Sequence, residues 1–268
     1  MSRLKLMSLA AIVALALIAA MPAYGAKPKA AAPKIDPRAL TMLRDMGQYV
    51  QGLQSFSVHL TTSRDVVSPS AQALTSDQAF DLYIQRPNHM RINMTSAAGK
   101  TQVYYDGSTV TIFTPAKNVY AVMPAGSTIL ETLQLMRKRG IEMPLATLLQ
   151  RSPDQPLTAN IISGMFVGTS LINGVQTNQL AFRGKQVDWQ IWIQDDPSAP
   201  LPVKVVIVDR RVEGRPRYTA YLSNWNVSPT FDPAMFSFTP PAGAQKINFS
   251  QLPKQPRMMR GTRPTARH

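Results

Sequence analysis

The sequence predicts an α+β fold in which a strongly curved antiparallel sheet is covered by helices on its concave side. Apolar and polar residues alternate with a period of two in many short runs between residues 56 and 227. Helical patterns occur only near the start and in the middle of the chain. The length of 268 residues is enough for one domain with a sizeable core.

The first predicted element is a helix from Pro37 to about Gly52. Asp36 suits the N-cap and Pro37 the first helical position, and apolar residues then recur every three or four positions. Three runs follow in which apolar and polar residues alternate, which is typical of strands with one buried face. The predicted strands cover residues 56–61, 80–85 and 90–95, and the Ser-rich stretch 64–78 is predicted to be a long loop.

Two dipeptides predict hairpins: Asp106-Gly107 indicates a type I′ turn, and Asn173-Gly174 is the strongest hairpin signal in the chain. Asp106-Gly107 joins predicted strands 103–105 and 110–113, and Asn173-Gly174 joins 164–172 and 175–183. Further strands are predicted at 118–123, 188–194, 203–208 and 218–227, with a last short strand at Phe236 and Phe238.

Two more helices are predicted between these groups of strands. The first covers residues 128–139, because Thr128 and Glu131 have the spacing of a capping box. The second is short, covers residues 144–151 and begins at Pro144.

The N-terminal sequence predicts that the protein is exported. Residues 1–25 are typical of a cleavable signal peptide, with Arg3 and Lys5 before an apolar run and small residues Ala23 and Gly25 at the −3 and −1 positions. The apolar run is shorter than a spanning helix needs, and a retained membrane anchor is the alternative. The chain has no Cys, so the mature protein is not expected to be a lipoprotein. We therefore predict a periplasmic protein.

Positive charge is concentrated outside the predicted domain. The net charge is +14, yet residues 41–250 hold 18 basic and 14 acidic residues and so contribute only +4. We predict a flexible basic linker at 26–35, a single domain at 36–250 and a disordered basic tail at 251–268. The tail either contacts an anionic membrane surface or only aids solubility. Nucleic acid is not an expected partner of an exported chain.

Few residues suit catalysis or metal binding. There are 3 His and no Cys, and the common nucleotide-binding, nucleophile-elbow and zinc motifs are absent. We predict no catalytic residue, no metal site and no cofactor, and hence no enzyme.

Several segments resemble an uncharacterised family of predicted periplasmic proteins, domain of unknown function 2092, within the LolA-like superfamily. They are Gln85-Arg86-Pro87-Asn88-His89-Met90-Arg91, Tyr104-Tyr105-Asp106-Gly107, Asn118-Val119-Tyr120, Asp188-Trp189-Gln190-Ile191-Trp192, Leu222-Ser223-Asn224-Trp225-Asn226-Val227 and Phe238-Thr239-Pro240-Pro241-Ala242-Gly243-Ala244. The family often has Cys and His before the Leu-Ala-Phe strand, where this chain has Thr177 and Gln179.

The resemblance implies an incomplete β-barrel whose concave apolar face is closed by helices and receives acyl chains or other lipid moieties. The expected function is non-catalytic binding of a lipid or lipoprotein acyl chain in envelope transport or maintenance. The candidate lipid-binding residues are Phe80, Leu82, Ile84, Met90, Ile92, Met94, Leu130, Leu133, Met136, Trp189 and Ile191. Arg86 and Arg91 are candidate charged residues at the opening, although a structural role in ion pairs or turn hydrogen bonds is the favoured alternative.

An alternative function stays open. The same fold with a solidly packed core would be a periplasmic interaction or sensor module that acts through its surface. Trp192, on the polar side of its predicted strand, and the basic tail would then make the contacts. The sequence does not predict an oligomeric state.

Overall fold

One twelve-stranded sheet organises the part of the chain that this computed structural model describes, residues 34–67, 72–141 and 160–252. Its strands are β1 (Ser55–Val67), β2 (Ala73–Gln85), β3 (His89–Ser96), β4 (Gly99–Tyr105), β5 (Thr109–Thr114), β6 (Val119–Pro124), β7 (Ile161–Ile172), β8 (Val175–Gly184), β9 (Val187–Gln194), β10 (Pro202–Asp209), β11 (Arg217–Asn226) and β12 (Gln245–Lys246). The helices are α1 (Pro37–Gly52) and α2 (Ile129–Lys138), with 3₁₀ turns η1 (Pro115–Lys117), η2 (Pro233–Phe236) and η3 (Phe249–Gln251).

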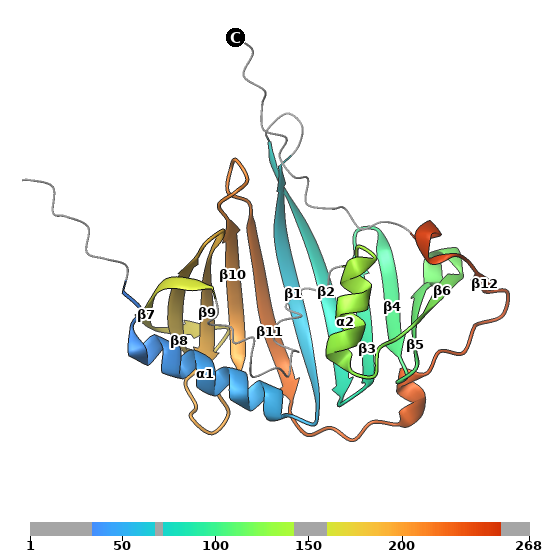
Figure 1. The fold of residues 1–268 in the computed structure, drawn as a ribbon, viewed down its shortest axis with the longest axis horizontal. Helices are drawn as coiled ribbons and strands as arrows, with labels where there is room; N and C mark the ends of the chain where they lie inside the picture. Colours follow the sequence, from blue (N-terminus) through green and yellow to red (C-terminus); the bar gives the residue numbers. More distant parts are fainter. Residues whose placement is uncertain (1–33, 68–71, 142–159, 253–268) are drawn as a thin grey trace, which may run out of the picture. The chain divides into compact units, whose positions relative to one another are not determined.

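The sheet is curved and open. Its strand order is β12-β6-β5-β4-β3-β2-β1-β11-β10-β9-β8-β7, so β12 and β7 are its edges (Figure 1). Neighbouring strands are antiparallel, except for β12, which pairs parallel to β6. The predicted class, an antiparallel sheet that forms an incomplete barrel with few helices, is confirmed.

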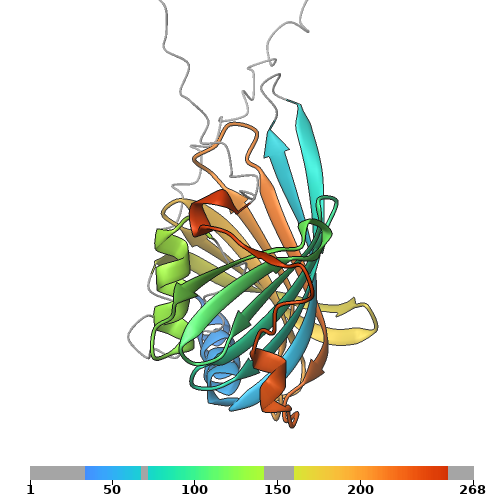
Figure 2. The ribbon, with the colours of Figure 1, turned by 90° about the vertical axis from the view of Figure 1, so that its right-hand side faces the viewer.

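Both helices lie on the same side of the sheet (Figures 1 and 2). In α1, Asp36 caps the first turn by accepting a hydrogen bond from the Arg38 amide at 2.9 Å. In α2, the Thr128 hydroxyl accepts one from the Glu131 amide at 3.2 Å. The caps therefore set the starts of both helices where the sequence predicts them.

The two hairpin predictions have different outcomes. The hairpin between β7 and β8 is confirmed, and its turn is of type I′, because Asn173 and Gly174 both have positive φ, 49° and 82°. At the other hairpin only Gly107 has positive φ, so a type I′ turn is wrong there. The Asp106 carboxylate instead closes that turn by accepting hydrogen bonds from the amides of Ser108 and Thr109, at 2.9 and 2.7 Å.

Two other predictions are wrong. The stretch 64–78 is mostly strand rather than loop, because β1 continues to Val67 and β2 begins at Ala73. Phe236 ends the 3₁₀ turn η2, which Asp232 caps by accepting a hydrogen bond from the Ala234 amide at 2.9 Å, and no strand forms there. The predicted signal peptide, most of the linker, helix 144–151 and most of the tail lie outside the described residues.

Between β11 and β12, the chain packs on the outer face of the sheet, away from the helices (Figure 2). The ring of Phe238 contacts the rings of three outward-facing aromatic residues of β4, β5 and β6 at centroid distances of 5.1 to 5.3 Å. These are Tyr104, Phe113 and Tyr120. The Gln245 amide then donates to the Asn118 carbonyl at 2.9 Å, which begins the β6–β12 pairing. Aromatic contacts and backbone hydrogen bonds together fix this segment.

We expect Phe236→Ala to reduce the free energy of unfolding by about 3–4 kcal/mol, because Phe236 is fully buried against His89 and Phe231. Denaturant unfolding measures the change. Ser237→Ala, at the exposed neighbouring position, should change it by less than about 0.5 kcal/mol. If Phe236→Ala changes the free energy of unfolding as little as Ser237→Ala does, the packing of Phe236 does not stabilise the fold.

Candidate functional site

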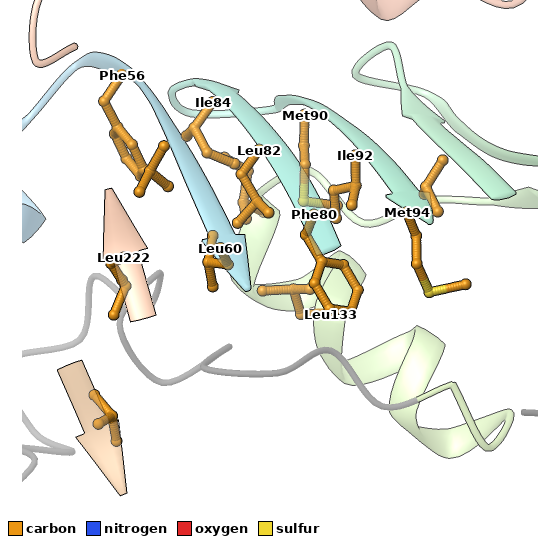
Figure 3. Packing of buried hydrophobic residues seen from close by; sticks show 14 of the residues in the cluster. Phe56, Leu60, Phe80, Leu82, Ile84, Met90, Ile92, Met94, Leu133 and Leu222 are labelled. Atoms are coloured by element: carbon orange, nitrogen blue, oxygen red, sulfur yellow. The ribbon is translucent and has the colours of Figure 1, made fainter. Parts of the chain in front are cut away.

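The inner face of the sheet, the side covered by α1 and α2, carries one continuous apolar cluster, which we call the inner-face cluster. Figure 3 shows side chains of β1, β2, β3 and β11 pointing into the same space as Leu133 of α2. Beyond the residues labelled there, the cluster includes Leu43 and Met46 of α1, Tyr105 of β4 and Leu180 of β8. Side chains from both halves of the sheet therefore meet in one apolar region.

The structure brings together most of the predicted lipid-binding residues. The buried members of the inner-face cluster are Phe80, Leu82, Ile84, Met90, Ile92, Met94, Leu133, Met136 and Ile191. Trp189 is partly buried and packs against them. Whether they bind lipid stays a prediction.

Leu130 is placed differently from the other candidates. It is only half-buried and lies outside the inner-face cluster. Ile129, Leu133 and Met136 occupy the buried side of α2, because residues three and four positions apart share one helix face. The sequence pattern contained Ile129, but the site prediction left it out.

The contribution of α1 was also missed. Leu43 and Met46 are almost fully buried against the sheet, and Leu40 and Met42 pack at the margin of the cluster. The apolar periodicity that predicted the helix also predicts which side of it is buried, so the signal was available.

Arg86 joins the end of β2 to the end of α1. Its Nε donates to the Leu53 carbonyl at 3.0 Å, and its amide donates to the Gln54 carbonyl at 2.8 Å. Leu53 is the C-cap of α1, so Arg86 satisfies backbone oxygens where the helix meets the strand. These contacts favour the structural alternative for Arg86.

Arg91 lies on the outer face, which contradicts its placement at an opening of the inner face. Along β3, Met90, Ile92 and Met94 are buried on the inner side, and Arg91 alternates with them. Its guanidinium lies 4.6 Å from the centre of the Tyr104 ring and donates to the Met235 carbonyl at 3.3 Å. Arg91 therefore helps to hold the C-terminal segment on the outer face.

Polar contacts attach the start of α2 to the sheet. The Tyr105 hydroxyl donates to the Gly126 carbonyl at 2.7 Å, and the Ile129 amide donates to the Pro87 carbonyl at 3.0 Å. Burial raises the pKa of Tyr105, which keeps this hydroxyl protonated as a donor at neutral pH. After the helix, the Arg139 guanidinium lies 5.6 Å from the centre of the Phe249 ring. Between these contacts, α2 rests on the sheet through apolar side chains and the buried Thr132, whose hydroxyl accepts a hydrogen bond from the Gly126 amide at 3.0 Å.

Trp192 is not an exposed contact residue. It is 7% exposed, and the Lys204 ammonium lies 4.6 Å from the centre of its ring. Lys204, on the neighbouring strand β10, thus covers the Trp192 ring, although the alternation along the strand alone places that ring on the polar face.

Within residues 34–67, 72–141 and 160–252, no group of three or more His, Asp or Glu side chains is arranged to hold a metal ion. None of the helices in those ranges has the length and apolar character required to cross a membrane.

The family model of a group called "predicted periplasmic protein (DUF2092)" matches residues 39–250. This match confirms the family resemblance seen in the motifs. No curated protein is similar enough to match this sequence.

Several solved structures are similar to this chain. LprF from Mycobacterium bovis has 18% identity and a TM-score of 0.44, with 79% of this chain and 100% of that chain covered. Lipoprotein LppX from Mycobacterium tuberculosis has 16% identity and a TM-score of 0.46, with 74% and 100% covered. The LolA superfamily protein NE2245 from Nitrosomonas europaea has 11% identity and a TM-score of 0.35, with 75% and 97% covered.

We expect Tyr105→Phe to loosen the start of α2, because the variant removes the hydrogen bond to Gly126. The free energy of unfolding should fall by about 1–2 kcal/mol, and amide hydrogen exchange should accelerate in α2 more than in α1. The matched control is Tyr104→Phe, which removes a hydroxyl that donates to Gln102 on the outer face. Unchanged exchange of α2 in Tyr105→Phe would mean that this hydrogen bond does not hold the helix.

Proposed function

Because the chain belongs to the DUF2092 family of predicted periplasmic proteins, we propose that it is a non-catalytic periplasmic binder of a lipid or lipoprotein acyl chain. The acyl chain would lie between the inner face of the sheet and the helices, and the role would be envelope transport or maintenance. Export by a cleaved signal peptide at residues 1–25, without lipid attachment to the protein itself, is part of this proposal.

The observation that carries the proposal is the continuity of the inner-face cluster. It extends from Leu180 on β8 to Met123 on β6, across the strands between them. An acyl chain has no polar group to satisfy along its length, so a binding face for it needs a long apolar surface. Methionine side chains, which adapt to irregular apolar ligands, come from both the sheet and the helices. They are Met46, Met90, Met94, Met123 and Met136.

Binding would require part of the helical cover to move. The buried side of α2 offers Ile129, Leu133 and Met136, whose apolar contacts have no fixed geometry. The hydrogen bonds near Gly126 and Ile129 lie at one end of the helix. An acyl chain could therefore replace the contacts of the helix body while its start stays attached. The basic residues of 251–268 would favour loading or release at an anionic membrane.

The direct test is native mass spectrometry, followed by organic extraction, of the protein purified from a bacterial periplasm. A lipid or lipoprotein fragment bound in a near-stoichiometric amount is the expected result. An unliganded mass, together with no uptake of an added fluorescent fatty acid, would overturn the proposal.

We expect Leu133→Glu to abolish fatty-acid binding, because it places a carboxylate on the buried side of α2, where Leu133 is 7% exposed. The control is Leu130→Glu, the same change three residues earlier at the half-buried position. Fluorescence titration measures binding, and circular dichroism checks that both variants fold. If both folded variants bind as the unchanged protein does, the ligand does not lie beneath α2.

A second candidate function rests on β7. Four large apolar residues of this edge strand are exposed, and the strand has no charged residue and no proline. They are Ile162 (39%), Met165 (58%), Val167 (49%) and Leu171 (66%). Edge strands are usually protected by charge or proline. Residues 34–36 already pair with part of the outer edge of β7, where the Asp36 amide donates to the Gly164 carbonyl at 2.9 Å, so the stretch left for a partner is 167–172. Because the chain carries +14, two copies approach each other most easily through an uncharged stretch, so the partner would be a second copy paired through residues 167–172 of β7.

For this candidate we expect Val167→Lys combined with Leu171→Lys to convert a dimer to a monomer, because like charges then face each other across the pairing. Analytical ultracentrifugation over a wide concentration range measures the state. Leu74→Lys, at an exposed leucine of β2, is the control. A protein that is monomeric without any substitution would rule this candidate out.

A further inference from the structure

The inner face has a polar end, formed by Arg64 of β1 and Tyr218 of β11. These residues are directly opposite in the antiparallel register, and the guanidinium carbon lies 5.9 Å from the centre of the Tyr218 ring. The register is continuous from His59 to Arg64. Since side chains alternate along a strand, Arg64 faces the same side as Leu60, and Tyr218 faces the same side as Leu222. Both Leu60 and Leu222 belong to the inner-face cluster.

Neither polar group has a hydrogen-bond partner within the described ranges. Tyr218 is only 7% exposed, and its hydroxyl is buried without a hydrogen bond to any residue in 34–67, 72–141 or 160–252. Over the same ranges, the Arg64 guanidinium makes no hydrogen bond and no ion pair. Buried polar groups in proteins are nearly always hydrogen-bonded, so an orphaned hydroxyl beside an unpaired cation points to an absent acceptor.

The acidic residues closest in sequence and register face the other side of the sheet. Asp65 follows Arg64 along β1, and its carboxylate accepts a hydrogen bond from the Arg217 amide at 3.1 Å. Asp77 is opposite Ser63 and accepts a hydrogen bond from its hydroxyl at 2.5 Å. The residue opposite Arg64 on β2 is the neutral Ser76. The alternation therefore leaves the cation of Arg64 without a neighbouring carboxylate on the inner face.

We propose that Arg64 and Tyr218 bind the anionic head, a carboxylate or a phosphate, of the acyl ligand that lies on the inner face. This inference rests on the proposed function and adds the chemical class of the ligand. The guanidinium supplies charge and several donors, and the tyrosine supplies one more donor from the neighbouring strand. Burial raises the pKa of Tyr218 by more than the neighbouring Arg64 charge and the Thr62 hydroxyl lower it, so the hydroxyl stays protonated and can donate well above neutral pH.

The length of the inner face fits this arrangement. Arg64 and Phe56 are eight residues apart on β1, which corresponds to about 26 Å of strand. One acyl chain occupies about half of a bilayer's hydrocarbon core, roughly 15 Å. With its head at Arg64, such a chain would pass Thr62 and reach the apolar side chain of Leu60, about 13 Å along the strand.

The test compares a fluorescent fatty acid, cis-parinaric acid, with its uncharged methyl ester, using protein from periplasmic expression of the full chain. We expect the unchanged protein to bind the acid about tenfold more tightly than the ester. Arg64→Gln should remove that preference and leave binding of the ester unchanged. Arg217→Gln, which removes the same charge from the exposed residue next to Tyr218, should keep the preference.

A second variant separates ligand binding from stability. Tyr218→Phe should weaken binding of the acid about fivefold without lowering the melting temperature, because the hydroxyl has no partner to lose in the unliganded protein. A lower melting temperature with unchanged binding would assign the hydroxyl a structural role and overturn its part in the site.

The outcomes distinguish the two proposals. If neither the acid nor the ester binds, the proposed function itself fails. If both bind equally and Arg64→Gln changes nothing, acyl binding stands and the anionic site is wrong. Displacement of the probe by a lysophospholipid more readily than by a fatty acid would identify a phosphate head. Displacement by inorganic phosphate alone would show a free-anion site and overturn the proposal.

Discussion

The pairing of β1 with β11 is the interaction on which the rest of this structure depends. Strands β1 to β6 and β7 to β11 each form a meander of consecutive neighbours, and this one ladder joins them into a single sheet. Its register places Leu60 opposite Leu222, so the apolar sides of both meanders become one inner face. A slip by one residue would turn the apolar side chains of one half to the outside, so burial of the inner face also fixes the register.

The two faces of the sheet are covered in physically different ways. On the outer face, the C-terminal segment is fixed by the aromatic contacts of Phe238, by backbone hydrogen bonds to β6 and by the hydrogen bond from Arg91 to Met235. On the inner face, aliphatic and methionine side chains of α1 and α2 make contacts that have no preferred direction. Directional contacts resist replacement, whereas apolar contacts can be exchanged for those of another apolar molecule. The inner face is therefore the side suited to a ligand.

The sequence predicted those features that depend on local chemistry. Alternation placed Met90, Ile92 and Met94 on one side of β3, and Asp36 and Thr128 marked the helix starts. The long ends of β1 and β2 were missed because Ser, Asp and Arg occupy both faces there, which removes the period of two. The burial of Trp192 depends on Lys204, a residue from another strand, which no local pattern contains. Arg64 and Tyr218 are 154 positions apart, so only the register of β1 with β11 reveals them as a pair.

The energy of exchanging one apolar cover for another decides whether such a face can both load and release a ligand. An acyl chain of about 14 methylene groups gains roughly 11 kcal/mol on leaving water, at about 0.8 kcal/mol for each group. Exposing Leu133 and Met136, the buried apolar side chains of the body of α2, costs roughly 3–6 kcal/mol, at about 1.5–3 kcal/mol each. This cost offsets part of the gain, and the same side chains can cover the bound chain. Release therefore costs less free energy than the full burial of the acyl chain gained, because α2 returns to the sheet as the ligand leaves. A polar site at one end of the face adds selectivity for the head group without enlarging the apolar contact that release must undo.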